Sequence, residues 1–198
     1  MAGDNERHDS ESLMAQSIGL NENALVAITR DSLSALRAAL FREVGPSAAA
    51  LLQEAGFAGG PALYAAFGRW LSSRRLPAPE SLAAADFSSR ASEFFRDIGW
   101  GSVSVGELAS VMTLDSSDWA EGDPDHPLDF PGCYYSAGAF AEFFGRVAGE
   151  PVAVMEVECR SMGAERCRFL VGATEIMQRV YDAMGEGVAY DQAVAAGT

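Results

Sequence analysis

The chain has 198 residues and a formal net charge of −14, and all 14 of its basic residues are Arg. The lack of Lys excludes Schiff-base chemistry on a lysine, a P-loop lysine and a kinase-type strand lysine, and the negative charge argues against direct nucleic-acid binding and against anionic membrane surfaces. A hydrophobic content of 48% predicts a packed globule, which at this length is one domain.

The N-terminal stretch is polar and acidic, so we expect a flexible acidic arm over residues 1–22 rather than a secretory signal. The single domain is expected over residues 23–184, with a tail over residues 185–198. No apolar stretch approaches the roughly 18 residues of a membrane span. Three cysteines without an export signal indicate a reducing compartment, and we therefore expect a cytoplasmic protein.

Helical spacing of apolar residues dominates the first half of the chain. Residues 25–28 form a short apolar run that is either an edge strand or the start of a helix. A helix then opens at Asp31 and stops at Gly45. Its expected apolar face consists of Leu33, Leu36, Leu40 and Val44.

Three more helices are expected before the strands begin. One spans residues 47–55 and ends at Gly56, and the next begins at Pro61 and runs to about Ser73. A further helical pattern carries Phe87 and Ile98 at its two ends. The region between Gly56 and Pro61 is thus predicted to be a break between two helices.

The pattern then changes to strands, which predicts an α+β fold with N-terminal helices packed against a small, mainly antiparallel sheet. The first hairpin is expected to turn at Gly106-Glu107. Residues 115–129 are acidic and predict a solvated loop that serves as a lid or interaction surface. A helix over residues 136–148, strands over residues 152–158 and 167–171, and an amphipathic helix over residues 174–183 complete the pattern.

All three cysteines lie in the last third of the chain. A hairpin between the last two strands brings Cys159 and Cys167 together, so that both sulfurs can bind one ion at ~2.3 Å, and Cys133 can approach the same corner. Glu156 is a candidate fourth ligand, although the pleat places residues three apart on opposite faces, and Glu158 is the competing carboxylate. The alternative is three unligated cysteines that act as small buried hydrophobic residues.

The residues between Gly122 and Gly172 carry a family resemblance. The matching runs are Cys133-Tyr134-Tyr135-Ser136-Ala137-Gly138, Gly149-Glu150-Pro151-Val152, Glu156 to Gly163, and Cys167-Arg168-Phe169. This motif core, residues 122–172, closely resembles the 4-vinyl reductase domain family, whose fold is shared with Golgi-transport tethering subunits and haem-based nitric oxide sensors. The family includes the sensory domains of bacterial activators that respond to phenols and xylenes, and a protein of bacteriochlorophyll biosynthesis.

The resemblance implies a structural zinc ion that pins the C-terminal hairpin beside a buried cavity for an apolar or aromatic small molecule. Its zinc ligands map onto Cys133, Glu156, Cys159 and Cys167. Our candidates for the ligand pocket are Trp100, Tyr134, Phe140 and Phe144. The phenol-sensing members hold the effector hydroxyl with a histidine and a tryptophan, and no histidine of this chain maps onto that position. The expected ligand is therefore more apolar than a phenol, or absent.

The resemblance also implies a homodimer formed through the N-terminal helices. The phenol-sensing members continue into an ATPase domain and a helix-turn-helix that this sequence does not contain, so we expect signalling through a partner protein. A noncatalytic sensor or carrier is the first hypothesis. An adaptor that resembles the tethering subunits, with its cavity filled by side chains, is the second, and an accessory protein of tetrapyrrole biosynthesis is the third.

We expect no enzyme activity. The glycine clusters at residues 56–60 and 185–187 lack the GxGxxG order of a dinucleotide site. A zinc ion with four protein ligands also leaves no open position for an activated water. A true reductase therefore ranks last.

Overall fold

The computed structural model describes residues 19, 22 and 24–196, so the predicted arm lies almost wholly outside the described residues. In chain order its elements are α2 (Arg30–Val44), α3 (Ser47–Ser73), η1 (Pro79–Ser81), α4 (Ala84–Asp97), β1 (Ser104–Leu108), β2 (Val111–Ser116), α5 (Tyr134–Ala148), β3 (Val152–Glu158), η2 (Arg160–Met162), β4 (Cys167–Ala173), α6 (Thr174–Gly185) and α7 (Tyr190–Ala196). The four strands form one antiparallel sheet in the order β1-β2-β4-β3. The predicted α+β class is therefore confirmed.

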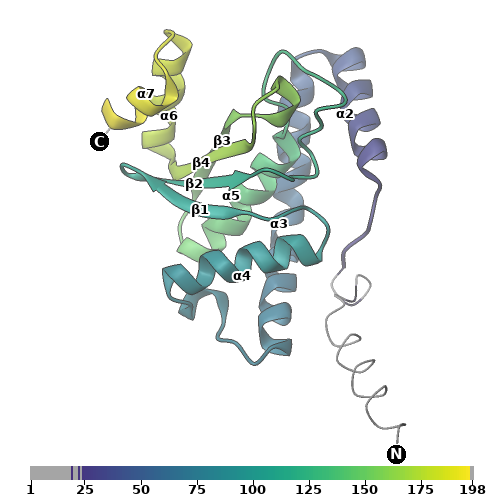
Figure 1. Ribbon diagram of the computed structural model, residues 1–198, viewed down its shortest axis with the longest axis vertical. Coiled ribbons are helices and arrows are strands. Elements are labelled where there is room, and N and C mark those ends of the chain that lie inside the picture. Colours follow the sequence, from purple (N-terminus) through teal and green to yellow (C-terminus); the bar gives the residue numbers. More distant parts are fainter. Residues whose placement is uncertain (1–18, 20–21, 23, 197–198) are drawn as a thin grey trace, which may run out of the picture.

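Helices cover both faces of the sheet (Figure 1). One face packs on α3, α4 and α5 through a large aromatic cluster, and the other packs on α6 and α7 through a smaller aliphatic cluster. Successive strand residues point to opposite faces, so Phe169 enters the aromatic cluster and Leu170 the aliphatic one. The aromatic rings are those of Phe67, Trp70, Phe87, Phe94, Phe95, Trp119, Phe140, Phe143, Phe144 and Phe169.

α3 is a single helix of 27 residues, so the predicted break between Gly56 and Pro61 is wrong. Gly56 and Gly60 are buried where α3 crosses α5, and a Cβ on Gly56 would lie 1.9 Å from the Tyr135 carbonyl oxygen. Pro61 is on the exposed side, where water can reach the carbonyl that its missing N–H leaves unpaired. Packing against α5 outweighs the local helix breakers.

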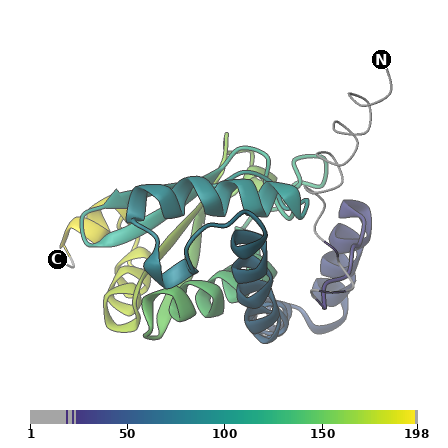
Figure 2. The ribbon, with the colours of Figure 1, turned by 90° about the horizontal axis from the view of Figure 1, so that it is seen from below.

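The predicted apolar face of α2 is only partly correct. Leu33 is buried, but Leu36 and Val44 are exposed, and the buried side includes Arg37. The Arg37 guanidinium donates to the carbonyl oxygen of Glu121 at 2.9 Å. α2 therefore packs on the loop before α5, through Arg37 and through the ring of Phe41, which lies 4.9 Å from that of Phe130. Figure 2 shows α2 set apart from α4 and α5, beyond α3.

Three further predictions need correction. Residues 25–29 form neither a strand nor a helix. The β1–β2 hairpin turns at Ala109-Ser110 rather than at Gly106-Glu107, and Ala109 adopts the positive φ of 49° that such two-residue turns require. The C-terminal region contains α7, which the sequence pattern did not predict, and its Ala193 and Val194 are buried in the aliphatic cluster.

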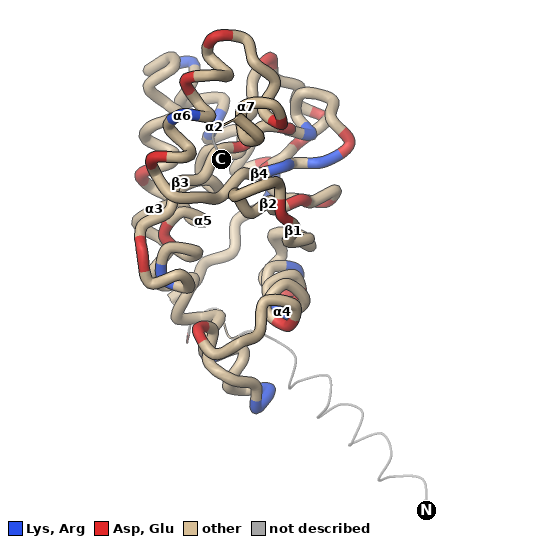
Figure 3. Tube along the Cα trace, turned by 90° about the vertical axis from the view of Figure 1, so that its left-hand side faces the viewer, with Lys and Arg blue, Asp and Glu red and all other residues tan. Residues whose placement is uncertain are grey.

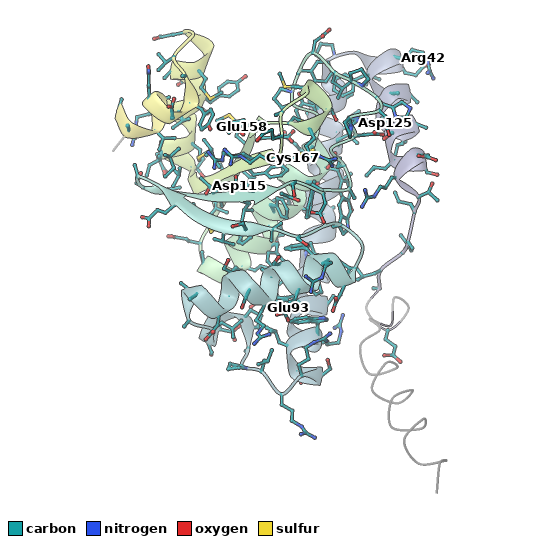
Figure 4. The ribbon with its side chains drawn as sticks, viewed as in Figure 1. Arg42, Glu93, Asp115, Asp125, Glu158 and Cys167 are labelled. Carbon is teal, nitrogen blue, oxygen red and sulfur yellow. The ribbon has the colours of Figure 1, made fainter. Side chains whose placement is uncertain are left out.

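Acidic residues are distributed over the whole described part of the chain (Figure 3). Two arginines of the last hairpin are paired with acids: Arg168 lies 2.6 Å from Asp115 and Arg166 lies 2.9 Å from Glu158. Figure 4 shows Asp115 and Glu158 close together near Cys167. Of the helices described, not even α3 combines the length and apolar character needed to cross a bilayer.

Candidate functional site

Three thiols and one carboxylate meet at the end of the last hairpin. The ligand atoms of Cys133, Glu156, Cys159 and Cys167 all lie within 4.8 Å of one another, and all four residues are buried. Cys133 is the residue immediately before α5, Glu156 lies on β3, Cys159 follows β3, and Cys167 begins β4. The structure thus brings together all four residues that were predicted to form a metal site.

A backbone irregularity explains how Glu156 and Cys159 meet. The pairing register with β4 shifts between Glu156 and Glu158, as in a β-bulge, and β3 ends at Glu158. The alternation of a regular strand, which would place residues three apart on opposite faces, therefore lapses before Cys159. Glu158 pairs with Arg166 instead, so Glu156 is the carboxylate that joins the thiols.

The geometry of the cluster fits a tetrahedral metal ion. Two sulfurs bound to one such ion at ~2.3 Å lie about 3.8 Å apart. The Cys133 Sγ lies 4.0 Å from the Cys159 Sγ and 3.8 Å from the Cys167 Sγ. Glu156 accepts the Cys133 N–H at 2.8 Å through Oε2, and its buried Oε1 has no hydrogen-bond partner among the described residues. A cation would satisfy that oxygen, whose burial alone is costly.

The electrostatics of the cluster also favour a cation. Burial raises the pKa of the Cys133 thiol well above its ordinary value. Burial, and then the neighbouring Cys159 sulfur, raise the pKa of Glu156 to about 8. Four acidic groups in one buried corner cannot all ionise unless a positive charge lies among them. The cluster could therefore hold a metal ion.

The loop before α5 closes over the sulfur cluster. A Cβ on Gly122 would lie 2.4 Å from the Cys167 Sγ, so the backbone passes directly over that sulfur. Arg160 donates to the Gly122 carbonyl at 3.2 Å, and the Asp123 N–H donates to the Ser161 hydroxyl at 2.9 Å. The cluster is thus enclosed by the loop as well as by the hairpin.

A second buried carboxylate, that of Glu121, lies at the N-terminus of α5. It accepts the backbone N–H of Tyr135 at 3.1 Å and that of Ser136 at 2.8 Å, and the Ser136 hydroxyl donates to it. The same hydroxyl accepts the Trp119 indole N–H at 2.7 Å. Burial raises the pKa of Glu121 to about 7, although these donors and the helix N-terminus favour the charged form. Trp119, Glu121 and Ser136 therefore form one fully connected polar group.

An apolar cavity of about 180 Å³ adjoins this polar group. Apolar cavities of about 150 Å³ accept benzene, so it has room for one aromatic ring. Trp100 lines the cavity, and its ring is parallel to that of Tyr135, with the ring centres 5.7 Å apart and an interplanar angle of 2°. The lining residues are Ala24, Leu25, Val26, Gly59, Ala62, Leu63, Phe95, Ile98, Trp100, Trp119, Tyr135, Ser136, Ala139 and Phe140.

The four residues predicted to line a ligand pocket separate into two pairs. Trp100 and Phe140 line this cavity, whereas Tyr134 and Phe144 lie outside it. Each helical residue advances by about 100° around the axis, so Tyr135 rather than Tyr134 faces the cavity. Tyr134 lines an open groove beside the thiol cluster, and Phe144 is buried in the aromatic cluster.

Sequence reasoning missed Trp119 and Glu121 because the acidic stretch was interpreted as a solvated loop, and it gave Ser136 no role beyond its place in a helix. That interpretation is wrong for its first part: Asp115 belongs to β2, and Glu121 is only 2% exposed. The available signal was Trp119, a large aromatic residue that is rarely left in water.

Comparison with known proteins supports the fold. Residues 126–173 match the model of the 4-vinyl reductase domain family, which confirms the resemblance seen in the sequence. No match is found among curated proteins. The phenol-responsive sensory domain of the transcription activator PoxR, solved with phenol, is 20% identical with a TM-score of 0.60, and the alignment covers 76% of this chain and 77% of that chain.

A vinyl-4-reductase family protein from Methanocaldococcus jannaschii is 17% identical with a TM-score of 0.51, and the alignment covers 86% of this chain and 97% of that chain. At these identities the two structures establish a shared fold. Residues 126–173 are therefore similar to the 4-vinyl reductase domain, and the chain shares the fold of these two proteins.

Proposed function

We propose that the protein is a noncatalytic, zinc-stabilised domain that binds an apolar or aromatic small molecule and acts as a sensor or carrier. The observation that carries this proposal is the apolar cavity, which shares the first turn of α5 with the thiol cluster. Cys133 directly precedes that turn, and Tyr135 and Ser136 within it line the cavity. The phenol-responsive PoxR domain has the same fold and was solved with phenol, which supports a small aromatic ligand.

The polar groups of the cavity favour a ligand with at most one polar substituent. The Ser136 hydroxyl is already engaged by Glu121 and Trp119. Tyr135 and Trp100 also line the cavity, and the hydroxyl of one and the indole N–H of the other are groups that can donate to a ligand acceptor. Burial raises the pKa of Tyr135, which keeps its hydroxyl protonated. The side chains of the other lining residues offer mainly apolar contacts.

Zinc is the ion that we propose for the cluster, with Cys133, Glu156, Cys159 and Cys167 as its ligands. When bound to four protein groups, zinc supplies a cross-link between chain segments and no open position for substrate. That cross-link would join the start of α5 to the last hairpin, and the loop at Gly122 covers it. Reduced thiols are required for it, and this supports a cytoplasmic location.

We propose that the protein forms a homodimer and signals ligand binding through a partner protein. Of the nine exposed large apolar side chains in the described region, six lie before residue 58, namely Val26, Ile28, Leu36, Val44, Leu51 and Phe57. Exposed apolar groups that gather in one region often mark interaction surfaces. Analytical ultracentrifugation of a Leu36→Ser, Val44→Ser variant should give a monomer. Tyr181→Ser, which removes an exposed apolar side chain of α6 instead, is the matched control and should remain dimeric.

Native mass spectrometry of the purified protein tests the main proposal. We expect one zinc per chain and either a retained small molecule or uptake of added toluene. Zinc without uptake, and no thermal shift across an aromatic and tetrapyrrole panel, would favour the adaptor hypothesis. A thermal shift with tetrapyrroles alone would favour the third hypothesis, an accessory protein of tetrapyrrole biosynthesis. Three freely titratable thiols and no stoichiometric metal would contradict the zinc proposal.

A further inference from the structure

One wall of the apolar cavity is the irregular segment that precedes α2. Ala24, Leu25 and Val26 belong to it, and Figure 1 shows the segment leaving α2 without helix or strand. Leu25 packs against the aromatic cluster, whereas Val26 is 87% exposed and Ile28 is 60% exposed. Leu25 is therefore the apolar side chain that attaches this segment to the domain.

The segment is held far more weakly than the opposite wall. No backbone hydrogen bond joins residues 24–28 to any other residue that the structure describes. The first backbone bond of this region is made by Thr29, whose carbonyl accepts the Leu33 N–H at the start of α2. On the other side of the cavity, α3 and α5 touch through their backbones at Gly56. If a wall moves for a ligand, it is the one held by Leu25.

We propose that Leu25 is the specificity-determining residue of the cavity, a removable closure whose side chain limits the ligand to one aromatic ring. This inference rests on the proposed function. With Leu25 in place the cavity measures about 180 Å³, which suits a single substituted ring. Truncation to Ala removes the branched end of the side chain and frees the space that a second fused ring needs.

The test compares the binding of toluene and naphthalene to the zinc-loaded wild type, to Leu25→Ala and to Ile28→Ala. Ile28→Ala is the matched control, because it also shortens an apolar side chain of the same segment but lies outside the cavity lining. We expect the wild type and Ile28→Ala to prefer toluene. Leu25→Ala should shift the naphthalene-to-toluene affinity ratio by roughly tenfold or more. An unchanged ratio in Leu25→Ala would overturn the inference and leave the proposed function intact.

Acrylamide quenching of tryptophan fluorescence supplies a readout that needs no ligand. Trp119 lines the cavity and is only 2% exposed, so opening the closure should make it more accessible to the quencher. The quenching constant should rise in Leu25→Ala and stay unchanged in Ile28→Ala. Equal quenching in all three proteins would overturn the role of Leu25. If no protein binds either probe, the proposed function fails for these ligands, and quenching alone decides whether Leu25 closes the cavity.

Discussion

On one side of the first turn of α5, three sulfurs and a carboxylate converge within 4.8 Å. On the other side, apolar side chains surround a cavity of about 180 Å³. The first region is specified by polar atoms from separate segments, and a displacement of any of them leaves a buried acid without its partner. The second is specified by packing, and one of its walls is attached by Leu25. The comparison shows that the same helix terminus supports a rigid corner, which is the thiol cluster, and an adaptable site, which is the apolar cavity.

Cys159→Ser should have the largest effect, because it removes a proposed ligand from the rigid corner. Loss of the metal should destabilise the fold on the order of 5 kcal/mol, which lowers Tm by roughly 10 to 20 °C at this chain length. Circular dichroism melting and elemental analysis would measure both changes. Glu158→Gln, on the neighbouring carboxylate that pairs with Arg166, should keep its metal. A Cys159→Ser protein that melts with the wild type would refute the structural role.

Gly138→Ala should have the second largest effect on stability, because it disrupts the backbone contact that holds α5 against α3 between the two regions. A Cβ at Gly138 would lie 2.0 Å from the Gln53 carbonyl oxygen, and the forced separation of α3 and α5 should cost about 3 kcal/mol or more. Gly68→Ala is the matched control on α3: its Cβ meets nothing within 4 Å and should stabilise the helix by about 0.5 to 1 kcal/mol. Urea denaturation of both variants would show opposite signs, and equal values would mean that the crossing is not tight.

Glu121→Gln should change how the free energy of unfolding depends on pH, because Glu121 is a buried acid outside the thiol cluster. Its folded pKa of about 7 lies above the ordinary 4.5, so the folded state binds the extra proton between these values. The free energy of unfolding of the wild type relative to that of the variant should therefore fall as pH rises from about 4.5 to about 7, by about 3 kcal/mol, and stay level at higher pH. Urea denaturation across this range measures the difference. A pH-independent difference would show that Glu121 does not titrate there.

Tyr190→Phe should have the smallest effect, since it acts on the far face of the sheet. The Tyr190 hydroxyl donates to Glu158 and accepts from Arg168 at 3.1 Å, and its loss should cost about 1 kcal/mol. Metal content and toluene binding should be unchanged. Tyr181→Phe, at a side chain that is 63% exposed, should leave Tm unaltered. An altered metal content in Tyr190→Phe would mean that the two faces are coupled.

The features that follow from neighbouring residues could be predicted from the sequence. The phenylalanine spacing of α4 and the hairpin that brings Cys159 close to Cys167 depend on short stretches, and both are confirmed. The continuity of α3 through Gly56 could not be predicted, because it depends on α5, which is distant in sequence. The cavity was only half predicted for a similar reason: a rotation of one residue along α5 decides that Tyr135 faces it.

The buried Glu121 shows the same limit for polar residues. In sequence it belongs to an acidic run, and only the fold brings Ser136 and the first turn of α5 to its carboxylate. Charge composition predicts the solvation of a segment as a whole, but the partners of one carboxylate depend on tertiary structure.

The glycine contacts between α3 and α5 have a mechanical consequence. Because main chain touches main chain at Gly56 and Gly138, no side-chain rotamer lies between the two helices to absorb a shift. A displacement of the first turn of α5 would therefore pass directly to α3, whose 27 residues span about 40 Å.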